Sequence, residues 1–198
     1  MKRKAALSRD DILRGLRRLD DLAKEAGKVA EIAIYGGAAL SLAFDMRVST
    51  RDVDAVIRGA TDFVRAAAAR IAQEEDWPAD WLNDGVKGFV SPNEELLLMK
   101  EFGAASGSGL RIFMPSPQYL FAMKCMAMRP EGLDGSHDIS DIEALAHAAE
   151  IPDAAAALDI VEAFYPKGKI PPKVGFGIAE IMERVQAKRS TSRKRNGK

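Results

Sequence analysis

The stretch Tyr35–Ile57, YGGAALSLAFDMRVSTRDVDAVI, decides the predicted fold. Residues 32–35 predict a short strand, and residues 38–44 are mostly good helix formers with little β-branching. Gly36 and Gly37 therefore lie where a strand turns into a helix. At such a turn, the exposed N–H groups and the helix dipole favour a bound anion, and glycine lets a phosphate approach the backbone.

The end of this stretch carries two aspartates in a strand pattern. Because side chains alternate faces along a strand, Asp52 and Asp54 share one face, with α-carbons about 6–7 Å apart. The opposite face is apolar and consists of Val53, Ala55 and Ile57. Two carboxylates at this spacing repel by roughly 2–3 kcal/mol at an effective dielectric of about 20, and a divalent cation removes that cost. Mg²⁺ or Mn²⁺, shared with a substrate triphosphate, suits such oxygen ligands. A solvated edge-strand face or a pair of caps is the alternative.

This pattern resembles the signature of the nucleotidyltransferase (polymerase-beta-like) superfamily, in which a Gly-Gly or Gly-Ser pair precedes Asp-apolar-Asp/Glu. It is most similar to the minimal bacterial branch that contains AbiEii- and MenT-type toxins. The residues that carry the resemblance are Gly36, Gly37, Arg47, Thr50, Asp52 and Asp54. The spacer Ala38–Arg51, with 14 residues, is slightly longer than usual, and Gly37 offers no hydroxyl where many members have serine.

The resemblance implies a function and a set of site residues. Asp52 and Asp54 would be catalytic metal ligands, and Gly36, Gly37 and Thr50 would bind the nucleotide. The cofactor would be Mg²⁺ or Mn²⁺, and the substrate an NTP. The implied reaction transfers a nucleotidyl group to an acceptor such as RNA or tRNA. The implied setting is a toxin–antitoxin pair with a cognate antitoxin.

The second half of the chain adds a lysine and two more aspartates. Lys124 lies within a strongly apolar predicted helix, residues 117–128, where its ammonium must reach the surface or find an anion. Asp138 and Asp141 lie one turn apart at the start of another helix. In the AbiEii-like branch, a lysine and an aspartate of this half complete the site. The resemblance therefore implies that Lys124 binds triphosphate as a catalytic residue and that Asp141 is the distal carboxylate. The alternatives are a salt bridge between lobes for Lys124 and Asp141, and helix capping for Asp138.

One feature departs from polymerase-like members of the superfamily. A third catalytic carboxylate usually arrives on a strand in this part of the chain, but the strand predicted over residues 110–114 has Arg111 as its polar member. This departure favours an alternative function, a catalytically degenerate nucleotide-binding or protein-interaction protein with the same fold. The preceding residues 96–102 fit a strand or a short helix equally well.

The order of predicted elements indicates an α/β (α+β) protein, and the resemblance implies the minimal nucleotidyltransferase fold. The 198 residues, 47% of them hydrophobic, can bury a core. We expect a core over residues 1–115 with a mixed sheet flanked by helices, and a helical lobe over 116–187. A basic tail, 188–198, is expected to be disordered.

The remaining signals concern location and partners. Cys125 is the only cysteine, which excludes an intramolecular disulfide. There is no apolar run of about 18 residues and no signal peptide, which predicts a cytoplasmic protein without a membrane anchor. The net charge is zero, but basic residues cluster at both ends, so a nucleic-acid-binding module that works through these tails is a third candidate. Trp77 and Trp81 are candidates for stacking on a nucleobase or for packing on the core.

Overall fold

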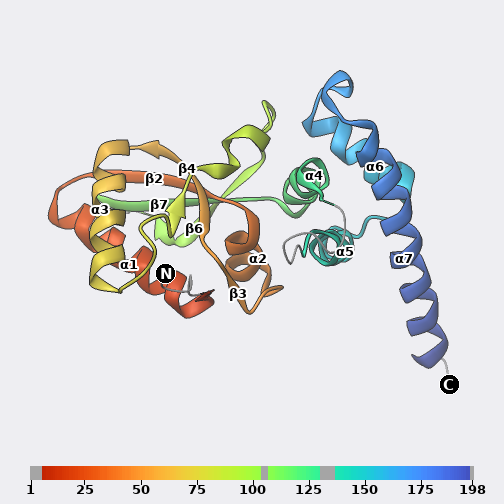
Figure 1. The fold of residues 1–198 in the computed structure, drawn as a ribbon, viewed down its shortest axis with the longest axis horizontal. Coiled ribbons are helices and arrows are strands. Elements are labelled where there is room, and N and C mark those ends of the chain that lie inside the picture. Colours follow the sequence, from red (N-terminus) through yellow and green to blue (C-terminus); the bar gives the residue numbers. More distant parts are fainter. Residues whose placement is uncertain (1–5, 104–106, 130–136, 197–198) are drawn as a thin grey trace. The chain divides into compact units, whose positions relative to one another are not determined.

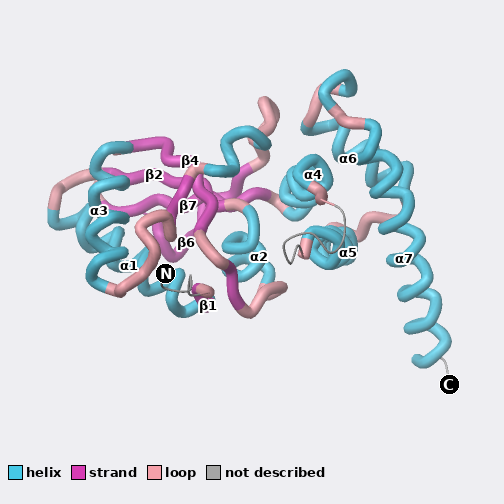
Figure 2. Tube along the Cα trace, in the orientation of Figure 1, coloured by secondary structure: helices cyan, strands magenta, loops and turns pink. Residues whose placement is uncertain are grey.

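The computed structural model describes residues 6–103, 107–129 and 137–196 (Figure 1). The chain forms two compact units. One consists of Met1–Gly88 and Leu96–Pro115, and the other of Phe89–Glu95 and Ser116–Lys198. Strands and helices alternate in the first unit, whereas the described regular structure of the second is helical (Figure 2). The predicted mixed α/β class, with helices flanking a mixed sheet, is confirmed.

The first unit is built on a five-stranded mixed sheet. Its strands are β2 (Val29–Ile34), β4 (Val53–Gly59), β5 (Leu82–Asn83), β6 (Leu96–Gly103) and β7 (Gly109–Pro115). They lie in the order β5-β4-β2-β7-β6. β2 is parallel to β7 and antiparallel to β4, β5 is parallel to β4, and β6 is antiparallel to β7. Pairing with β7 makes β6 a strand, which its periodicity alone did not decide.

The helices of the first unit are α1 (Arg9–Glu25), α2 (Gly36–Phe44) and α3 (Thr61–Glu74). Ser8 followed three positions later by Asp11 predicts a capping box at the start of α1, and the structure confirms it. Ser8 Oγ accepts from Asp11 N at 3.2 Å, and Ser8 N donates to Asp11 Oδ2 at 2.9 Å. α1 contacts both α3 and β7, and Figure 1 shows α1 and α3 side by side. The apolar stripe of α1 therefore faces the core.

Two tryptophans fill the space between α1 and α3. Trp81 is completely buried, and its Nε1 donates to Ala68 O of α3 at 2.9 Å. The edge of Trp77 meets Trp81 with ring centroids 5.2 Å apart. On the α1 side, a Cβ at Gly15 would lie 2.9 Å from each ring. Trp81 therefore packs in the core and does not stack on a nucleobase.

A second, two-stranded sheet was not predicted. β1 (Leu7–Ser8) and β3 (Ser49–Thr50) pair antiparallel, with Leu7 opposite Thr50. Leu7 and Thr50 are both buried. The pairing joins the segment that follows α2 to the residues that precede α1. Thr50 is therefore held in place by Leu7 of the neighbouring strand.

The second unit contains α4 (Pro117–Ala127), α5 (Asp138–Ala148), α6 (Ala154–Phe164), the short 3-10 helix η2 (Lys167–Lys169) and α7 (Pro172–Asn196). Ser116 before Pro117 is a typical N-cap sequence, and Ser116 does cap α4, where its Oγ accepts from Tyr119 N at 3.2 Å. The segment Phe89–Glu95 belongs to this unit, which the sequence did not predict. Ser91 N donates to Tyr119 Oη at 3.0 Å, and Asn93 Nδ2 donates to Ala163 O at 3.2 Å. The 3-10 helix η1 (Gly85–Phe89) precedes this segment.

The last helix continues beyond its predicted end at Ala187, through most of the segment expected to be disordered. The physical reason is that its residues bind the rest of the unit. Lys188 Nζ lies 2.6 Å from Glu143 Oε2, and Arg189 donates to Ile151 O at 2.8 Å. The side chains of Lys188 and Arg189 are thus used within the protein. Of the predicted basic ends, Lys2, Arg3, Lys4 and Lys198 lie outside the described residues.

Two further observations concern the predictions on location and on the cysteine. No helix in the described part of the chain is long and apolar enough to cross a membrane. The place of Cys125 in an apolar helix predicts a buried thiol, and the structure confirms this; burial raises the pKa of that thiol. His137 and His147 lack metal-ligand spacing, which predicts surface positions, and both are exposed.

Candidate functional site

The carboxylate of Asp54 lies against the backbone of Gly36. Antiparallel pairing of β2 and β4 leads to a hydrogen bond from Tyr35 N to Asp54 O at 2.8 Å, so the next residue, Gly36, meets the Asp54 side chain. Gly36 has φ +60, in the left-handed region that favours glycine, and a Cβ there would lie 2.6 Å from Asp54 Oδ2. The predicted glycine turn and the predicted acidic strand therefore meet at these two residues.

The glycine pair also forms the start of α2. Tyr35 occupies the N-cap position with an extended backbone, and its own side chain makes no cap hydrogen bond there. The first N–H groups of a helix lack intrahelical acceptors, and the dipole places partial positive charge at this end. An anionic group is therefore favoured at this position, and binding of a ligand anion by the glycine turn stays a prediction.

Gly37 faces a threonine and an arginine. A Cβ at Gly37 would lie 2.6 Å from Thr50 Oγ1 and 2.9 Å from Arg47 Nη1. The Thr50 hydroxyl therefore comes close to the place where a side chain at position 37 would begin. The sequence indicated that no hydroxyl is available at Gly37, but the structure brings one there from β3. The three residues Gly37, Arg47 and Thr50, all part of the resemblance, are brought together.

Asp52 lies just before the strand and not on it. β4 begins at Val53, and Asp52 belongs to the preceding bend, which corrects its predicted place on the strand. The predicted alternation still holds in the burial pattern, because Val53 and Ala55 are buried whereas Asp52 and Asp54 are half-buried. The two-residue strand β5 pairs only with Val53 and Asp54, which leaves Asp52 outside the ladder.

Asn83 and Gly85 border the other side of the Asp54 carboxylate. Asn83 of β5 is paired with Asp54 of β4. Gly85 N donates to Asn83 Oδ1 at 2.8 Å. A Cβ at Gly85 would lie 3.0 Å from Asn83 Oδ1 and 3.8 Å from Asp54 Oδ1. The sequence of this Trp-Leu-Asn-Asp-Gly segment predicts a turn or a short helix, not a strand. The strand pairing that brings Asn83 to Asp54 has no local signal.

Lys124, Asp138 and Asp141 form a compact ionic cluster inside the helical unit. Lys124 Nζ lies 2.8 Å from Asp141 Oδ2 and 3.4 Å from Asp138 Oδ1. Asp138 also accepts from Arg129 Nε at 3.2 Å and from Arg129 N at 3.3 Å. The side chains of Asp138 and Asp141 are only 7% and 5% exposed, so their charges need cationic partners.

This cluster decides between the structural alternatives for these residues. Lys124 of α4 and Asp141 of α5 belong to the same unit, so an ion pair between lobes is wrong. Capping is also wrong for Asp138, because His137 occupies the N-cap position and Asp138 binds Lys124 and Arg129 instead. The predicted roles of Lys124 and Asp141 toward a triphosphate stay predictions.

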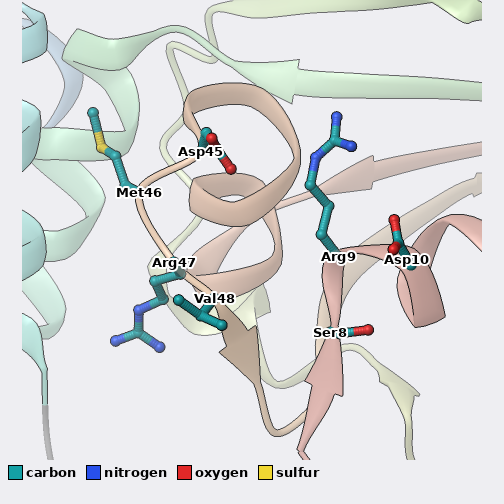
Figure 3. Close-up of a pocket in the computed structure, with 7 residues that line it drawn as sticks. All are labelled: Ser8, Arg9, Asp10, Asp45, Met46, Arg47 and Val48. Atoms are coloured by element: carbon teal, nitrogen blue, oxygen red, sulfur yellow. The ribbon is translucent and has the colours of Figure 1, made fainter.

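A pocket of about 480 Å³ lies beside Arg47 (Figure 3). It is lined by Ser8, Arg9, Asp10, Asp45, Met46, Arg47 and Val48. Figure 3 shows the guanidinium groups of Arg9 and Arg47 pointing in different directions. Because two arginines and two aspartates contribute opposite charges, the lining does not select an anion. We therefore assign no ligand to this pocket.

The residues present fit a divalent cation only in part. Asp52 and Asp54 supply carboxylate oxygens, the ligand type that Mg²⁺ and Mn²⁺ prefer, and the Gly36 backbone leaves space beside Asp54 that a Cβ would fill. Within the described ranges, however, no three acidic, histidine or cysteine side chains gather as a metal site. A cation at Asp54 would need further oxygen ligands from a substrate.

On β7, where a third carboxylate would be expected, the polar side chain is Arg111. It forms an ion pair that lies away from Gly36. Arg111 of β7 lies opposite Glu31 of β2, with Arg111 Nη1 3.0 Å from Glu31 Oε1. Glu31 precedes Gly36 by five residues, which is about 16 Å along an extended strand. Closer to Gly36, β7 contributes Phe113, which pairs with Ala33. β7 therefore brings no acid to this end of the sheet.

Comparison of the chain with family models, with curated proteins and with solved structures found no match. The interpretation of the site consequently depends on the residues themselves and on the geometry described above.

Proposed function

We propose that this chain is a metal-dependent nucleotidyltransferase that uses an NTP as substrate. In the reaction, an acceptor oxygen forms a bond to the α-phosphorus while the bond to pyrophosphate breaks. The observation that carries the proposal is the Asp54 carboxylate against Gly36, at the start of α2. A carboxylate and a phosphate at the same helix terminus repel each other unless a cation lies between them, which is the arrangement that a metal–triphosphate complex supplies.

The residues of the first unit have separate parts in this proposal. Asp52 and Asp54 would hold Mg²⁺ or Mn²⁺, which when bound neutralises charge on the triphosphate. The first N–H groups of α2, at Gly36 and Gly37, would donate to phosphate oxygens. Thr50 Oγ1 would add a hydroxyl donor beside Gly37, which supports the nucleotide-binding role predicted for Thr50.

The proposal keeps the wider setting implied by the resemblance. The acceptor class is RNA, including tRNA, the location is the cytoplasm, and the partner is a cognate antitoxin. Lys124 remains a proposed ligand of the triphosphate, and Asp141 remains the proposed distal carboxylate, either a base or a residue that orients Lys124. Because they already form an ion pair with each other, substitution of either residue alters the helical unit as well as any ligand contact.

The test is transfer of label from NTP to RNA. The protein is incubated with Mg²⁺, each common NTP labelled at the α-phosphate, and total RNA. We expect labelled RNA with the wild-type chain and loss of label with Asp54→Asn, which keeps the shape of the side chain and removes its charge. Asp62→Asn, at an exposed aspartate of the same unit, is the matched control and should retain transfer. Equal transfer by wild type and Asp54→Asn would disprove the proposal.

A second candidate is a nucleotide-binding protein of the same fold without turnover. The Glu31–Arg111 ion pair and the apolar end of β7 favour it, because they leave no third carboxylate to act as a general base there. This candidate predicts Mg²⁺-dependent NTP binding that Asp54→Asn abolishes, with no label transferred to RNA. Calorimetry of the same variants separates the two candidates.

A further inference from the structure

We propose that Asn83 is a nucleotide-binding residue that donates its Nδ2 hydrogens to a phosphate group of the NTP. This inference rests on the proposed function, because it takes the nucleotide to be held at Asp54. It adds a donor from β5, on the side of Asp54 away from β2.

The backbone of Asn83 is held firmly beside Asp54. β5 pairs in parallel with the start of β4, with Leu82 opposite Val53 and Asn83 opposite Asp54. Val53 N donates to Trp81 O at 2.6 Å. Trp81 is completely buried, and its side chain is hydrogen-bonded to α3. Asn83 comes only two residues after this buried anchor. Such support keeps a binding side chain in place without help from a ligand.

The orientation of the Asn83 amide follows from one hydrogen bond. Gly85 N–H is a donor, so the Asn83 atom that it meets at 2.8 Å must be the oxygen, Oδ1. The Nδ2 group is then the other end of the amide. Among the residues that the structure describes, none accepts a hydrogen bond from it. Asn83 is half-buried, so the two Nδ2 hydrogens remain available to a ligand.

The glycine at position 85 keeps the space beside this amide open. Gly85 does not have the positive φ that would itself require glycine. A Cβ at this position would lie 3.0 Å from Asn83 Oδ1 and within 4 Å of Asp54 Oδ1. The amide oxygen and one carboxylate oxygen thus border a space that is free of side-chain atoms of residue 85. A phosphate held at Asp54 would be bound by the opposite end of the amide, Nδ2, because Oδ1 already accepts from Gly85 N.

The donor role is preferred over direct metal ligation by Asn83. Its Oδ1 already accepts from Gly85 N, so a cation would have to share that oxygen with an N–H donor. The two Nδ2 hydrogens match the acceptor oxygens of a phosphate, and hydrogen bonds to charged groups are among the stronger ones in proteins. The two roles also predict opposite effects for Asn83→Asp, which replaces the donor group by an anionic oxygen.

The experiment is calorimetric titration of the full chain with a non-hydrolysable NTP analogue in Mg²⁺, and with Mn²⁺ alone. For Asn83→Ala we expect analogue affinity lower by about ten- to hundredfold, the range for a lost hydrogen bond to a charged group. Asn83→Asp should weaken analogue binding at least as much. Asn93→Ala, at an exposed asparagine of the helical unit, is the matched control and should bind like wild type. Thermal unfolding checks that each variant folds.

The outcomes separate this inference from the proposed function. If wild type binds the analogue, Asp54→Asn does not, and Asn83→Ala binds like wild type, the Asn83 inference is overturned while the proposed function stands. Tighter binding of Mn²⁺ and of the analogue by Asn83→Asp would also overturn it in favour of metal ligation. Failure of wild type to bind the analogue would overturn both. If Asn83→Ala does not fold, Gly85→Ala tests the same space, and unchanged affinity in that variant would count against the inference.

Discussion

The two units of the protein carry carboxylates in two different settings. In the helical unit, Asp138 and Asp141 are almost fully buried, and Lys124 and Arg129 lie within ion-pair distance. In the sheet unit, Asp54 is half-buried, and its two oxygens face the backbones of glycines, where side chains would otherwise stand. In one setting the carboxylates are buried among the protein's own cations, and in the other the carboxylate lies beside backbone that carries no side chain.

This difference separates stability from binding. A buried carboxylate must be neutralised for the fold to form, so its partners are part of the folded structure. A carboxylate beside two glycines contributes little to packing, and a Cβ at Gly36 would collide with it. We therefore expect substitutions at the first cluster to change mainly the free energy of unfolding, and substitutions around Asp54 to change mainly ligand binding.

The largest effect is expected for Lys124→Met. Removal of the ammonium leaves two buried carboxylates with fewer cationic partners, which should cost about 3–5 kcal/mol of the free energy of unfolding. Urea unfolding followed by circular dichroism measures this loss. The neighbouring Cys125 thiol is buried, and burial also raises its pKa. Its alkylation therefore requires opening of the helical unit, and the less stable variant should be alkylated faster.

Lys188→Met is the control for this substitution. It removes an ion pair with Glu143 in which the lysine is 61% exposed, and such pairs contribute at most about 1 kcal/mol. Equal losses for the two variants would show that the Lys124 cluster is no more important to stability than a surface ion pair.

An intermediate effect is expected for Gly36→Ala, and Gly27→Ala provides a matched control. Both glycines have φ near +60, so each substitution should cost about 1–2 kcal/mol in backbone conformation. A Cβ at Gly27 meets nothing within 4 Å, whereas one at Gly36 would collide with Asp54 Oδ2. Only Gly36→Ala should therefore reduce Mg²⁺-dependent binding of an NTP analogue in calorimetry.

The comparison of the two glycine variants has a clear contrary outcome. If Gly27→Ala and Gly36→Ala bind the analogue equally well, the closeness of Gly36 to Asp54 has no functional meaning. A second check is the stability of Gly36→Ala in the Asp54→Ala background. In that background the loss of unfolding free energy caused by the collision with Asp54 should disappear. The loss caused by the left-handed backbone conformation should remain.

A smaller effect is expected for Arg129→Gln. Its side chain is 58% exposed, so loss of the ion pair with Asp138 should cost less than about 1 kcal/mol. Combined with Lys124→Met, however, it should cost more than the sum of the two single losses, because both cations serve the same carboxylate. Urea unfolding of the double variant measures this coupling, and simple additivity would contradict a shared role at Asp138.

The smallest effect concerns acid stability at the surface of the sheet unit. Hydrogen bonds from Arg18, and then from Arg70, lower the pKa of the Glu74 carboxyl from 4.5 to about 2. A pKa lowered on folding contributes stability above the unfolded value of 4.5, and this is lost as the pH falls toward 2. Wild type should exceed Glu74→Gln in stability at neutral pH, and the difference should vanish in that range. A difference that persists at pH 2 would contradict this assignment.

The parts of the fold that the sequence predicted have local causes. Ser8 and Asp11 cap a helix through contacts three residues apart, and the glycine pair marks a turn through its own backbone freedom. The alternation around Asp54 follows from strand geometry, so the meeting of Gly36 with Asp54 was expected from the order of elements. The candidate site was predicted to this extent.

The parts that the sequence did not predict depend on distant contacts. β5 and β1 are two residues long, too short for any periodicity, and exist because they pair with β4 and β3. Asn83 could therefore not be recognised as a neighbour of Asp54. The same holds for the end of α7, where Arg189 binds the carbonyl of Ile151, a residue far earlier in the chain.

The chain enters the helical unit for a short segment and leaves it again before it completes the sheet. Phe89–Glu95 makes its hydrogen bonds with residues of α4 and α6, and β6 and β7 follow it. A truncated gene that stops after Pro115 would therefore encode all five strands of the sheet but would leave Ser91 and Asn93 without Tyr119 and Ala163. Anyone who wishes to express the sheet unit alone should replace Phe89–Glu95 by a polar linker instead of simply cutting at its last residue.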